Sequence, residues 1–183
     1  MSRLDRLLAA VDTLSLRSGQ AAAFLLLPIC GVMVFEVIAR YMFNAPTIWS
    51  TEIVVMFAGT LYIVGGAYTK YLRGHISVDT LYNYLPPRWQ AATRVFVHFP
   101  LFFLYVGVLL WTGSVFFWDA FVENERSGSL WNPVIWPYKF VVPLGALLIL
   151  LQGLADLIRD VRALITGKED PSAGPSDEIE PEI

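Results

Sequence analysis

The apolar residues of this chain gather in four long blocks that are separated by shorter polar segments. A helix that crosses a bilayer needs about 20 mostly apolar residues, because the hydrocarbon core is about 30 Å thick and a helix rises about 1.5 Å per residue. All four blocks are long enough, and they predict membrane-spanning helices over residues of about 20–43, 48–71, 93–118 and 136–158. The expected fold class is therefore an all-α integral membrane protein with four transmembrane helices.

The positions of the basic residues predict how these helices are oriented. Cytoplasmic segments of membrane proteins carry an excess of Lys and Arg. Ten of the 13 bases lie in or next to the N-terminal segment, the connection between the second and third spans, and the C-terminal segment. An even number of spans also places both termini on one side, so we expect an N-in/C-in arrangement. The expected interface anchors at the opposite, outer ends are Trp49, Trp118, Trp136 and Lys139.

Two segments outside the spans have the pattern of short amphipathic helices that lie in the inner membrane interface. In residues 1–19 the apolar residues fall on one helical face, and in residues 78–85 a second apolar face precedes Pro86 and Pro87. A flexible tether is the alternative for the first of these segments. The apolar face of that segment consists of Leu4, Leu7, Leu8, Val11 and Leu14.

Composition agrees with a membrane protein and separates the chain into two parts. Of the 183 residues, 56% are hydrophobic and 16% are charged, whereas soluble domains have roughly 45–50% apolar and about 25% charged residues. The net charge of −3 conceals an acidic end, because residues 169–183 hold six acids and no base. We therefore expect a membrane domain over residues 1–166 and a disordered acidic tail over residues 167–183, where apolar side chains are too few to form a core.

Three charged residues near the outer end of the first hairpin require an explanation, because ionisable groups inside a span are costly. Glu36 and Arg40 are four residues apart with the acid first, which is the favourable order for an ion pair on a helix. Arg40 lies six residues before Pro46 and Glu52 lies six residues after it, so both should have a similar depth. We expect a structural polar cluster of Glu36, Arg40 and Glu52, and a contact with a substrate or ion path is the alternative.

Glycines and prolines predict local features of the spans. Glu52, Gly59 and Gly66 recur every seven residues, so Gly59 and Gly66 should form a helix-packing seam, where backbones can approach closely. A proline inside a helix removes one hydrogen bond and clashes with the carbonyl four residues earlier. Local kinks are therefore expected at Pro28, Pro100 and Pro143.

The few candidate ligands and nucleophiles argue against catalysis by this chain. Its single cysteine, Cys30, excludes a disulfide framework, and its two histidines are too few for most metal centres. A haem with two histidine ligands would need His75 and His98 at one depth, and a membrane-anchor cytochrome of a respiratory complex is the alternative function. No nucleophile–base pair or set of metal ligands emerges from the sequence. We expect no catalytic residue, no metal site, no cofactor and no enzyme activity.

Three stretches of the sequence resemble one known family. The first hairpin reads RYMFNAPTIWSTE, and it is followed by GGAYTKYLRGHISVDTLYNYLPPR. Both are similar to the small membrane subunit (the DctQ-like subunit) of TRAP, or tripartite ATP-independent periplasmic, transporters. The later stretch ENERSGSLWNPVIWPYKFVVPLGALLILLQGLADLIR resembles the end of these subunits. The positions that carry the resemblance are Arg40, Tyr41, Trp49, Glu52, Gly66, Ala67 and an inner-loop motif of His75, Val78 and Asp79.

The resemblance implies a function that the composition and the residue spacing do not indicate by themselves. Such systems have a periplasmic substrate-binding protein, a large permease subunit that holds the transport and sodium sites, and a small subunit. The small subunit would be a static scaffold in the bacterial inner membrane, in contact with membrane lipids and the large subunit, during sodium-driven uptake of an organic acid or related solute. No substrate-binding residue and no nucleic-acid partner is expected on this chain. In this family a second acid often precedes the glutamate at position 52, and Thr51 stands there instead.

Overall fold

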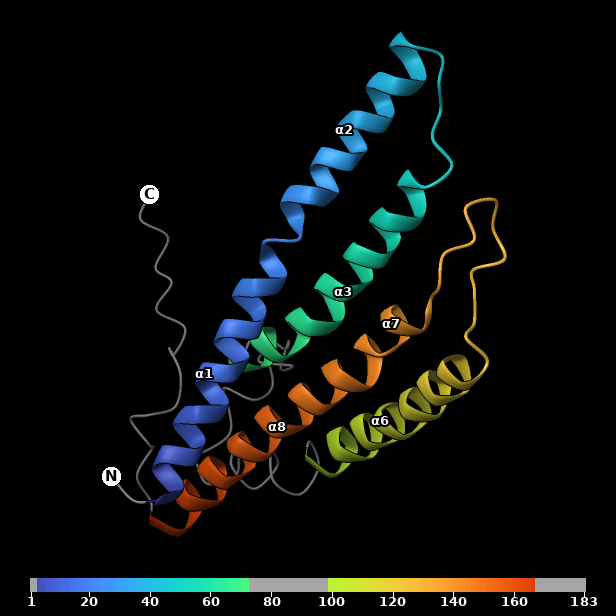
Figure 1. Cartoon of the computed structure of the whole chain (residues 1–183). Coiled ribbons are helices and arrows are strands. Elements are labelled where there is room, and N and C mark those ends of the chain that lie inside the picture. The colour runs from blue at the N-terminus through green and yellow to red at the C-terminus, as the bar shows by residue number, and fades with distance from the viewer. Residues whose placement is uncertain (1–2, 73–98, 167–183) are drawn as a thin grey trace, which may run out of the picture.

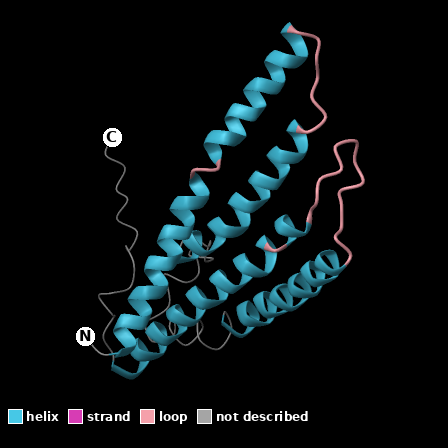
Figure 2. Ribbon diagram, in the orientation of Figure 1, coloured by secondary structure: helices cyan, strands magenta, loops and turns pink. Residues whose placement is uncertain are grey.

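The computed structural model of the chain describes residues 3–72 and 99–166. These residues form long helices that are joined by loops (Figure 1), and Figure 2 shows how little of the described chain lies outside helices. Besides the helices, the described residues contain one isolated antiparallel β-bridge, between Arg126 and Val134. The helices are α1 (Arg3–Ala23), α2 (Leu26–Met42), α3 (Ser50–Tyr71), α6 (Phe99–Val122), α7 (Trp136–Lys139) and α8 (Val141–Thr166).

Four stretches of the described chain are long and apolar enough to cross a membrane. They are Arg3–Met42, which comprises α1 and α2, and Ser50–Tyr71, Phe99–Val122 and Trp136–Arg162. The predicted fold class, an all-α membrane protein with four spans, is therefore confirmed. Two helices continue beyond their expected ends, α6 to Val122 and α8 to Thr166. The helix expected over residues 78–85 and the tail expected over residues 167–183 lie outside the described residues.

The first long stretch is interrupted just before Pro28. α1 ends at Ala23 and α2 begins at Leu26, and the ribbon narrows between them (Figure 1). Because proline has no N–H group, Pro28 cannot donate the helical hydrogen bond to the carbonyl of Phe24, four residues earlier. That carbonyl instead accepts a bond from the N–H of Leu27, at 3.2 Å. The break that Pro28 predicts is present, one turn before the proline.

Pro143 acts on the last span in the same way. α7 ends at Lys139, four residues before Pro143, and α8 begins at Val141 after a one-residue interruption at Phe140 (Figure 2). The short helix α7 therefore belongs to the same membrane-spanning stretch as α8. The third proline, Pro100, lies in the first turn of α6, and the residues before that helix lie outside the described part of the chain.

The helices α3 and α8 form the centre of the bundle. α3 packs against α1, α2 and α8, while α8 packs against α1, α3 and α6. α2 and α6 lie at opposite edges of the molecule (Figure 1), with α2 packed on α3, and α6 packed on α7 and α8. Much of the surface of the two edge helices is therefore free to contact lipid or another membrane protein.

The two central helices approach each other closely at glycines. A Cβ atom at Gly145 of α8 would lie 2.2 Å from Cγ2 of Ile63 and 3.0 Å from its carbonyl oxygen, so a larger residue requires the helices to separate. On α3, a Cβ atom at Gly66 would lie 2.9 Å from Cδ1 of Ile149. Helix association in lipid depends on such close packing, because lipid tails are as apolar as the side chains themselves.

Burial in the bundle is the reverse of burial in a soluble domain. The buried apolar side chains are mostly small, and Ala67 and Ala146 are almost inaccessible. Large apolar side chains point outward, among them Leu27 and Trp111, which are 71% and 75% exposed. A soluble protein seldom exposes so much contiguous apolar surface. The outer faces of the bundle therefore suit contact with lipid or with a partner inside the membrane.

Candidate functional site

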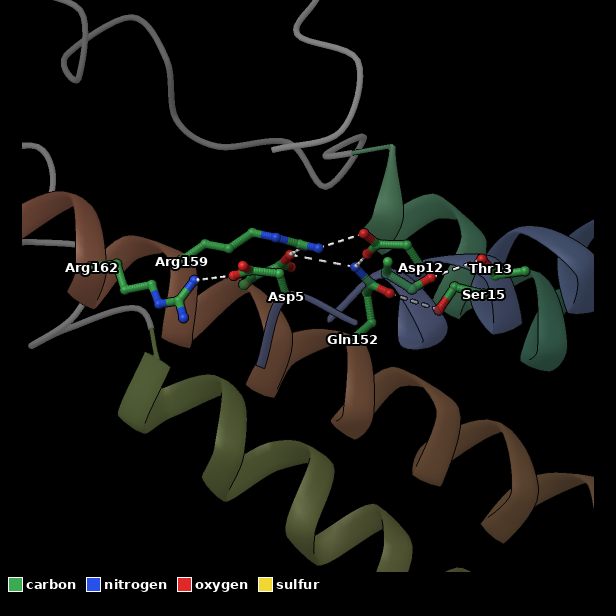
Figure 3. A network of polar contacts seen from close by, with 9 residues as sticks. Asp5, Asp12, Thr13, Ser15, Gln152, Arg159 and Arg162 are labelled. Atoms are coloured by element: carbon green, nitrogen blue, oxygen red, sulfur yellow. Dashed lines mark hydrogen bonds and ion pairs between the residues drawn. The ribbon is translucent and has the colours of Figure 1, made fainter. Parts of the chain in front are cut away.

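The most extensive group of polar contacts joins α1 to α8 at the end of the bundle where α1 begins and α8 ends (Figure 3). Gln152 of α8 is fully buried, accepts a hydrogen bond from the hydroxyl of Ser15 at 2.7 Å, and donates one to Asp12 at 3.1 Å. Arg159, which is 5% exposed, forms an ion pair with Asp12 and a second one with Asp156 at 3.4 Å. Gln152 and Arg159 of α8 thus both meet polar groups of α1, while the buried Nε of Arg159 has no hydrogen-bond partner among the described residues.

Two further ion pairs extend the group. Arg162 of α8 lies 2.9 Å from Asp5 of α1, and Lys70 of α3 lies 3.8 Å from Asp156. The ammonium of Lys70 is also 4.6 Å from the ring centroid of Phe102, within the range of a cation–π contact. We call these residues the α1–α8 cluster: Asp5, Asp12, Ser15, Lys70, Gln152, Asp156, Arg159 and Arg162.

The charges of the α1–α8 cluster balance, with three acids and three bases. A buried charge is tolerated when it is paired and hydrogen-bonded, and the long-range pairs tie α1 to one position along α8. The face of α1 that meets the bundle carries Asp5, Asp12 and Ser15, while Leu7 and Leu14 are 64% and 46% exposed. Of the leucine-rich face expected for the first segment, Leu7 and Leu14 therefore point away from the other helices, whereas Leu8 is buried.

Sequence reasoning did not anticipate the α1–α8 cluster, although a signal for it exists. On α1, Asp5 and Asp12 are seven residues apart, and on α8, Gln152, Asp156 and Arg159 follow at spacings of four and three. Residues at these spacings lie on one face of a helix. Two polar faces of complementary charge on separate apolar helices are a pattern that predicts a contact between them.

The second polar group closes the first hairpin at the opposite end of the bundle. Arg40 donates to one carboxylate oxygen of Glu36 from Nε at 3.0 Å and from Nη2 at 2.5 Å. Thr47, in the loop before α3, donates to the other oxygen from its backbone N–H at 3.1 Å and from its hydroxyl. Glu36 is 8% exposed, whereas the side chain of Arg40 is half exposed. We call Glu36, Arg40 and Thr47 the hairpin cluster.

Glu52 stands apart from the hairpin cluster. Arg40 and Glu52 form no ion pair, since the guanidinium of Arg40 is engaged by Glu36 one helical turn earlier. The Oε2 atom of Glu52 is buried and has no hydrogen-bond partner. Equal distance from Pro46 along the chain does not bring these side chains together, because α3 presents Glu52 toward α7 instead of α2. Thr47, and not Glu52, is the third member of the cluster with Glu36 and Arg40. No periodic pattern in the sequence identifies Thr47.

A groove beside Glu52 separates α3 from α6 and is floored by α7. It has a volume of about 300 Å³. Lys139 at its edge is 8% exposed, forms an ion pair with Glu125, and lies 3.8 Å from the ring centroid of Phe116. Lys139, expected to anchor at the membrane interface, is thus buried and paired. We call this hollow the α3–α6 groove, and its lining residues are Thr51, Glu52, Val55, Met56, Phe116, Ile135, Tyr138 and Lys139.

The remaining predicted residues occupy several environments. A Cβ atom at Gly59 would lie 2.2 Å from the hydroxyl oxygen of Tyr138, so Gly59 faces α7 while Gly66 faces α8. Trp49 stacks on Phe35 at 5.9 Å between ring centroids. Trp136 lies edge-on to Phe121 at 5.2 Å, and Trp118 is 61% exposed.

The inner-loop motif of His75, Val78 and Asp79 lies outside the described residues, as does His98. Within residues 3–72 and 99–166, no group of three or more His, Cys, Asp or Glu side chains is placed to hold a metal ion. The geometry of the described chain thus includes helix-joining ion pairs and an apolar groove beside an unpaired carboxylate oxygen.

Comparison with known proteins shows the family of this chain. The family model of tripartite ATP-independent periplasmic transporters, DctQ component, matches residues 29–163. This range contains the hairpin cluster, the α3–α6 groove and the α8 side of the α1–α8 cluster, whereas Asp5, Asp12 and Ser15 precede it. The sialic acid TRAP transporter permease protein SiaT of Haemophilus influenzae (strain 86-028NP) is 25% identical over 101 residues. That match covers 52% of this chain and 16% of the relative's own length.

The family match extends over well more than half of the chain and agrees with the four apolar spans. Its members are components of transporters and not enzymes. The comparisons give the membrane-anchor cytochrome alternative no support. The chain belongs to the family of DctQ components of tripartite ATP-independent periplasmic transporters.

Proposed function

We propose that this chain is the small permease subunit of a sodium-driven TRAP transporter and a scaffold for the large permease subunit during uptake of an organic acid or related solute. The observation that carries the proposal is where the charges lie. In the described spans, charged side chains gather toward the two ends and largely pair with one another there. A transport path usually places polar groups or unwound backbone near the bilayer centre. The apolar middle of this bundle suits a packing role.

The chain is a multi-pass protein of the bacterial inner membrane with both termini in the cytoplasm. The end of the bundle that holds the α1–α8 cluster also carries Arg3, Arg6 and Arg17, and cytoplasmic segments hold the excess of bases. The exposed leucines of α1 are then available to lipid at the inner interface. In a Cys30→Ser background, an impermeant thiol reagent applied from the periplasm should label Ser129→Cys and spare Arg17→Cys. The opposite labelling would contradict this orientation.

The partners of the subunit are the large permease subunit, a periplasmic substrate-binding protein and membrane lipids. The matched relative is by its name a sialic acid permease. Sialic acid is a carboxylated sugar, and so it is a reasonable first solute among the organic acids to be tested.

Reconstitution tests the proposal. Proteoliposomes that hold this chain alone should show no sodium-driven uptake, and addition of the large subunit with the substrate-binding protein should produce uptake that depends on a sodium gradient. A complex that is equally active without this chain would contradict the scaffold role. Saturable uptake by this chain alone would contradict it as well.

A further inference from the structure

The Oε2 atom of Glu52 is the buried carboxylate oxygen that has no hydrogen-bond partner among the described residues. The carboxylates of Glu36, Asp12 and Asp156 each bond to a base in this chain. The Oε2 atom of Glu52 is inaccessible to solvent and accepts no hydrogen bond from any described residue. A buried acceptor without a donor is costly, and more so for a charged group. Glu52 therefore has an unused capacity to accept a hydrogen bond.

The nearest bases are already occupied. Lys139 shares the α3–α6 groove with Glu52, but its ammonium is bound to Glu125 and lies over the ring of Phe116. Arg40 gives two hydrogen bonds to Glu36. Neither of these bases is therefore free to bond to Glu52.

The α3–α6 groove is shaped for an apolar occupant. Apart from its polar ends it is lined by Val55, Met56, Phe116 and Ile135. A second hollow of about 320 Å³ shares Phe116 with it and is lined by residues of α6 alone, which are Trp111, Thr112, Val115, Phe116 and Asp119. Figure 1 shows α7 and α8 between α3 and α6, and the groove lies where residues of α3, α6 and α7 line it together. A transmembrane helix that carries one side-chain donor is an elongated apolar body, and it satisfies both the apolar lining and the unpaired oxygen. A lipid with a donating headgroup is the competing occupant, which the crosslinking experiment below distinguishes.

We propose that the α3–α6 groove is the docking site for a transmembrane helix of the large permease subunit, and that an N–H or O–H donor of this helix bonds to Glu52. This inference rests on the proposed function, and it identifies the face of the subunit that contacts the large permease subunit. Hydrogen bonds between helices fix both partner and depth in a membrane, where close packing supplies the remaining attraction. Glu52 is then the specific contact, and Val55 and Phe116 provide the surface around it.

Site-specific photocrosslinking locates the partner on the assembled complex. A benzophenone amino acid replaces Val55 in the groove or, as the matched control, Val34 on α2; the two valines are 56% and 58% exposed. The probe at position 55 should link this chain to the large subunit, and the probe at position 34 should do so much less. Links only to lipid or to a second copy of this chain, or equal yields at both positions, would overturn the proposal. Failure of the unmodified subunits to co-purify would instead refute the proposed function, and the inference with it.

Substitution of Glu52 separates a docking role from a role inside the chain. In the complex, Glu52→Leu should reduce the co-purified large subunit about tenfold, the effect of losing one hydrogen bond to a charged group. Glu52→Gln, which keeps an acceptor oxygen, should lose less, and Glu123→Gln at an exposed position should have no effect. In the full chain purified alone, Glu52→Leu should leave the melting temperature unchanged or higher, because no internal bond is lost. Undiminished co-purification, or a lower melting temperature of the chain alone, would overturn the proposal.

Discussion

Buried charged groups are paired differently at the two ends of the bundle. In the α1–α8 cluster, three helices contribute acids and bases that neutralise one another within the chain. At the opposite end, the hairpin cluster closes on itself over a short stretch of sequence, and Glu52 next to it keeps an unpaired oxygen. At the first end the ion pairs close within the chain, although the buried Nε of Arg159 has no hydrogen-bond partner among the described residues. At the second end a carboxylate oxygen without a partner lies beside an apolar groove. In the docking arrangement proposed above, the first end holds the subunit together and the second end joins it to the complex.

The largest loss of stability is expected from the substitution of Arg159 in the α1–α8 cluster. Arg159→Leu leaves Asp12 and Asp156 without their shared base in a buried site. Loss of one member of a buried ion pair typically costs about 3–5 kcal/mol, so the melting temperature of the purified chain should fall steeply. Arg17→Leu, at an exposed position of α1, should stay within about 0.5 kcal/mol of the unmodified chain. Equal effects of the two substitutions would mean that the α1–α8 cluster does not hold α1 in place.

A smaller loss of stability is expected from Gly145→Ala, which tests how tightly α3 and α8 pack at the centre of the bundle. The added Cβ atom would lie 2.2 Å from Cγ2 of Ile63, and overpacking of this kind costs about 1–3 kcal/mol. Gly107→Ala on α6, where nothing lies within 4 Å of the new Cβ atom, is the matched control and should be neutral or stabilising. Thermal unfolding in lipid nanodiscs distinguishes them.

Glu36→Leu should lower the free energy of unfolding less than Arg159→Leu does. Arg40 loses its acceptor, but its side chain is half exposed and can reach solvent or lipid headgroups. Thr47 loses its partner as well, so a cost of about 1–2 kcal/mol is expected from the lost charged hydrogen bonds. If unfolding of Glu36→Leu matched that of Arg159→Leu, the hairpin cluster would be as important to the fold as the α1–α8 cluster.

The smallest effect is expected from Arg40→Gln. An ion pair with a half-exposed partner contributes about 0–1 kcal/mol, and Glu36 keeps both hydrogen bonds from Thr47. The melting temperature should therefore change little. A large decrease would show that the guanidinium of Arg40, and not the loop at Thr47, closes the first hairpin.

The sequence by itself determined the number of spans, their approximate bounds and the breaks within them. Each follows from a local cause: twenty apolar residues suffice to cross the hydrocarbon core, and Pro28 and Pro143 interrupt a helix one turn before their own positions. The pairing of Glu36 with Arg40 is equally local, because a spacing of four places two residues on one face of one helix.

Only the tertiary structure decided which faces of different helices meet. Asp12 and Arg159 are separated by 147 positions, and their contact depends on how α1 and α8 are rotated about their axes. Glu52 shows the same limit: symmetry about Pro46 predicts its depth, but the packing of α3 against α1, α2 and α8 sets the direction in which it points. Hydrophobic periodicity is weak in helices that are apolar on all sides. The sequence therefore specified the helices, and close packing at glycines together with a few long-range ion pairs determined their arrangement.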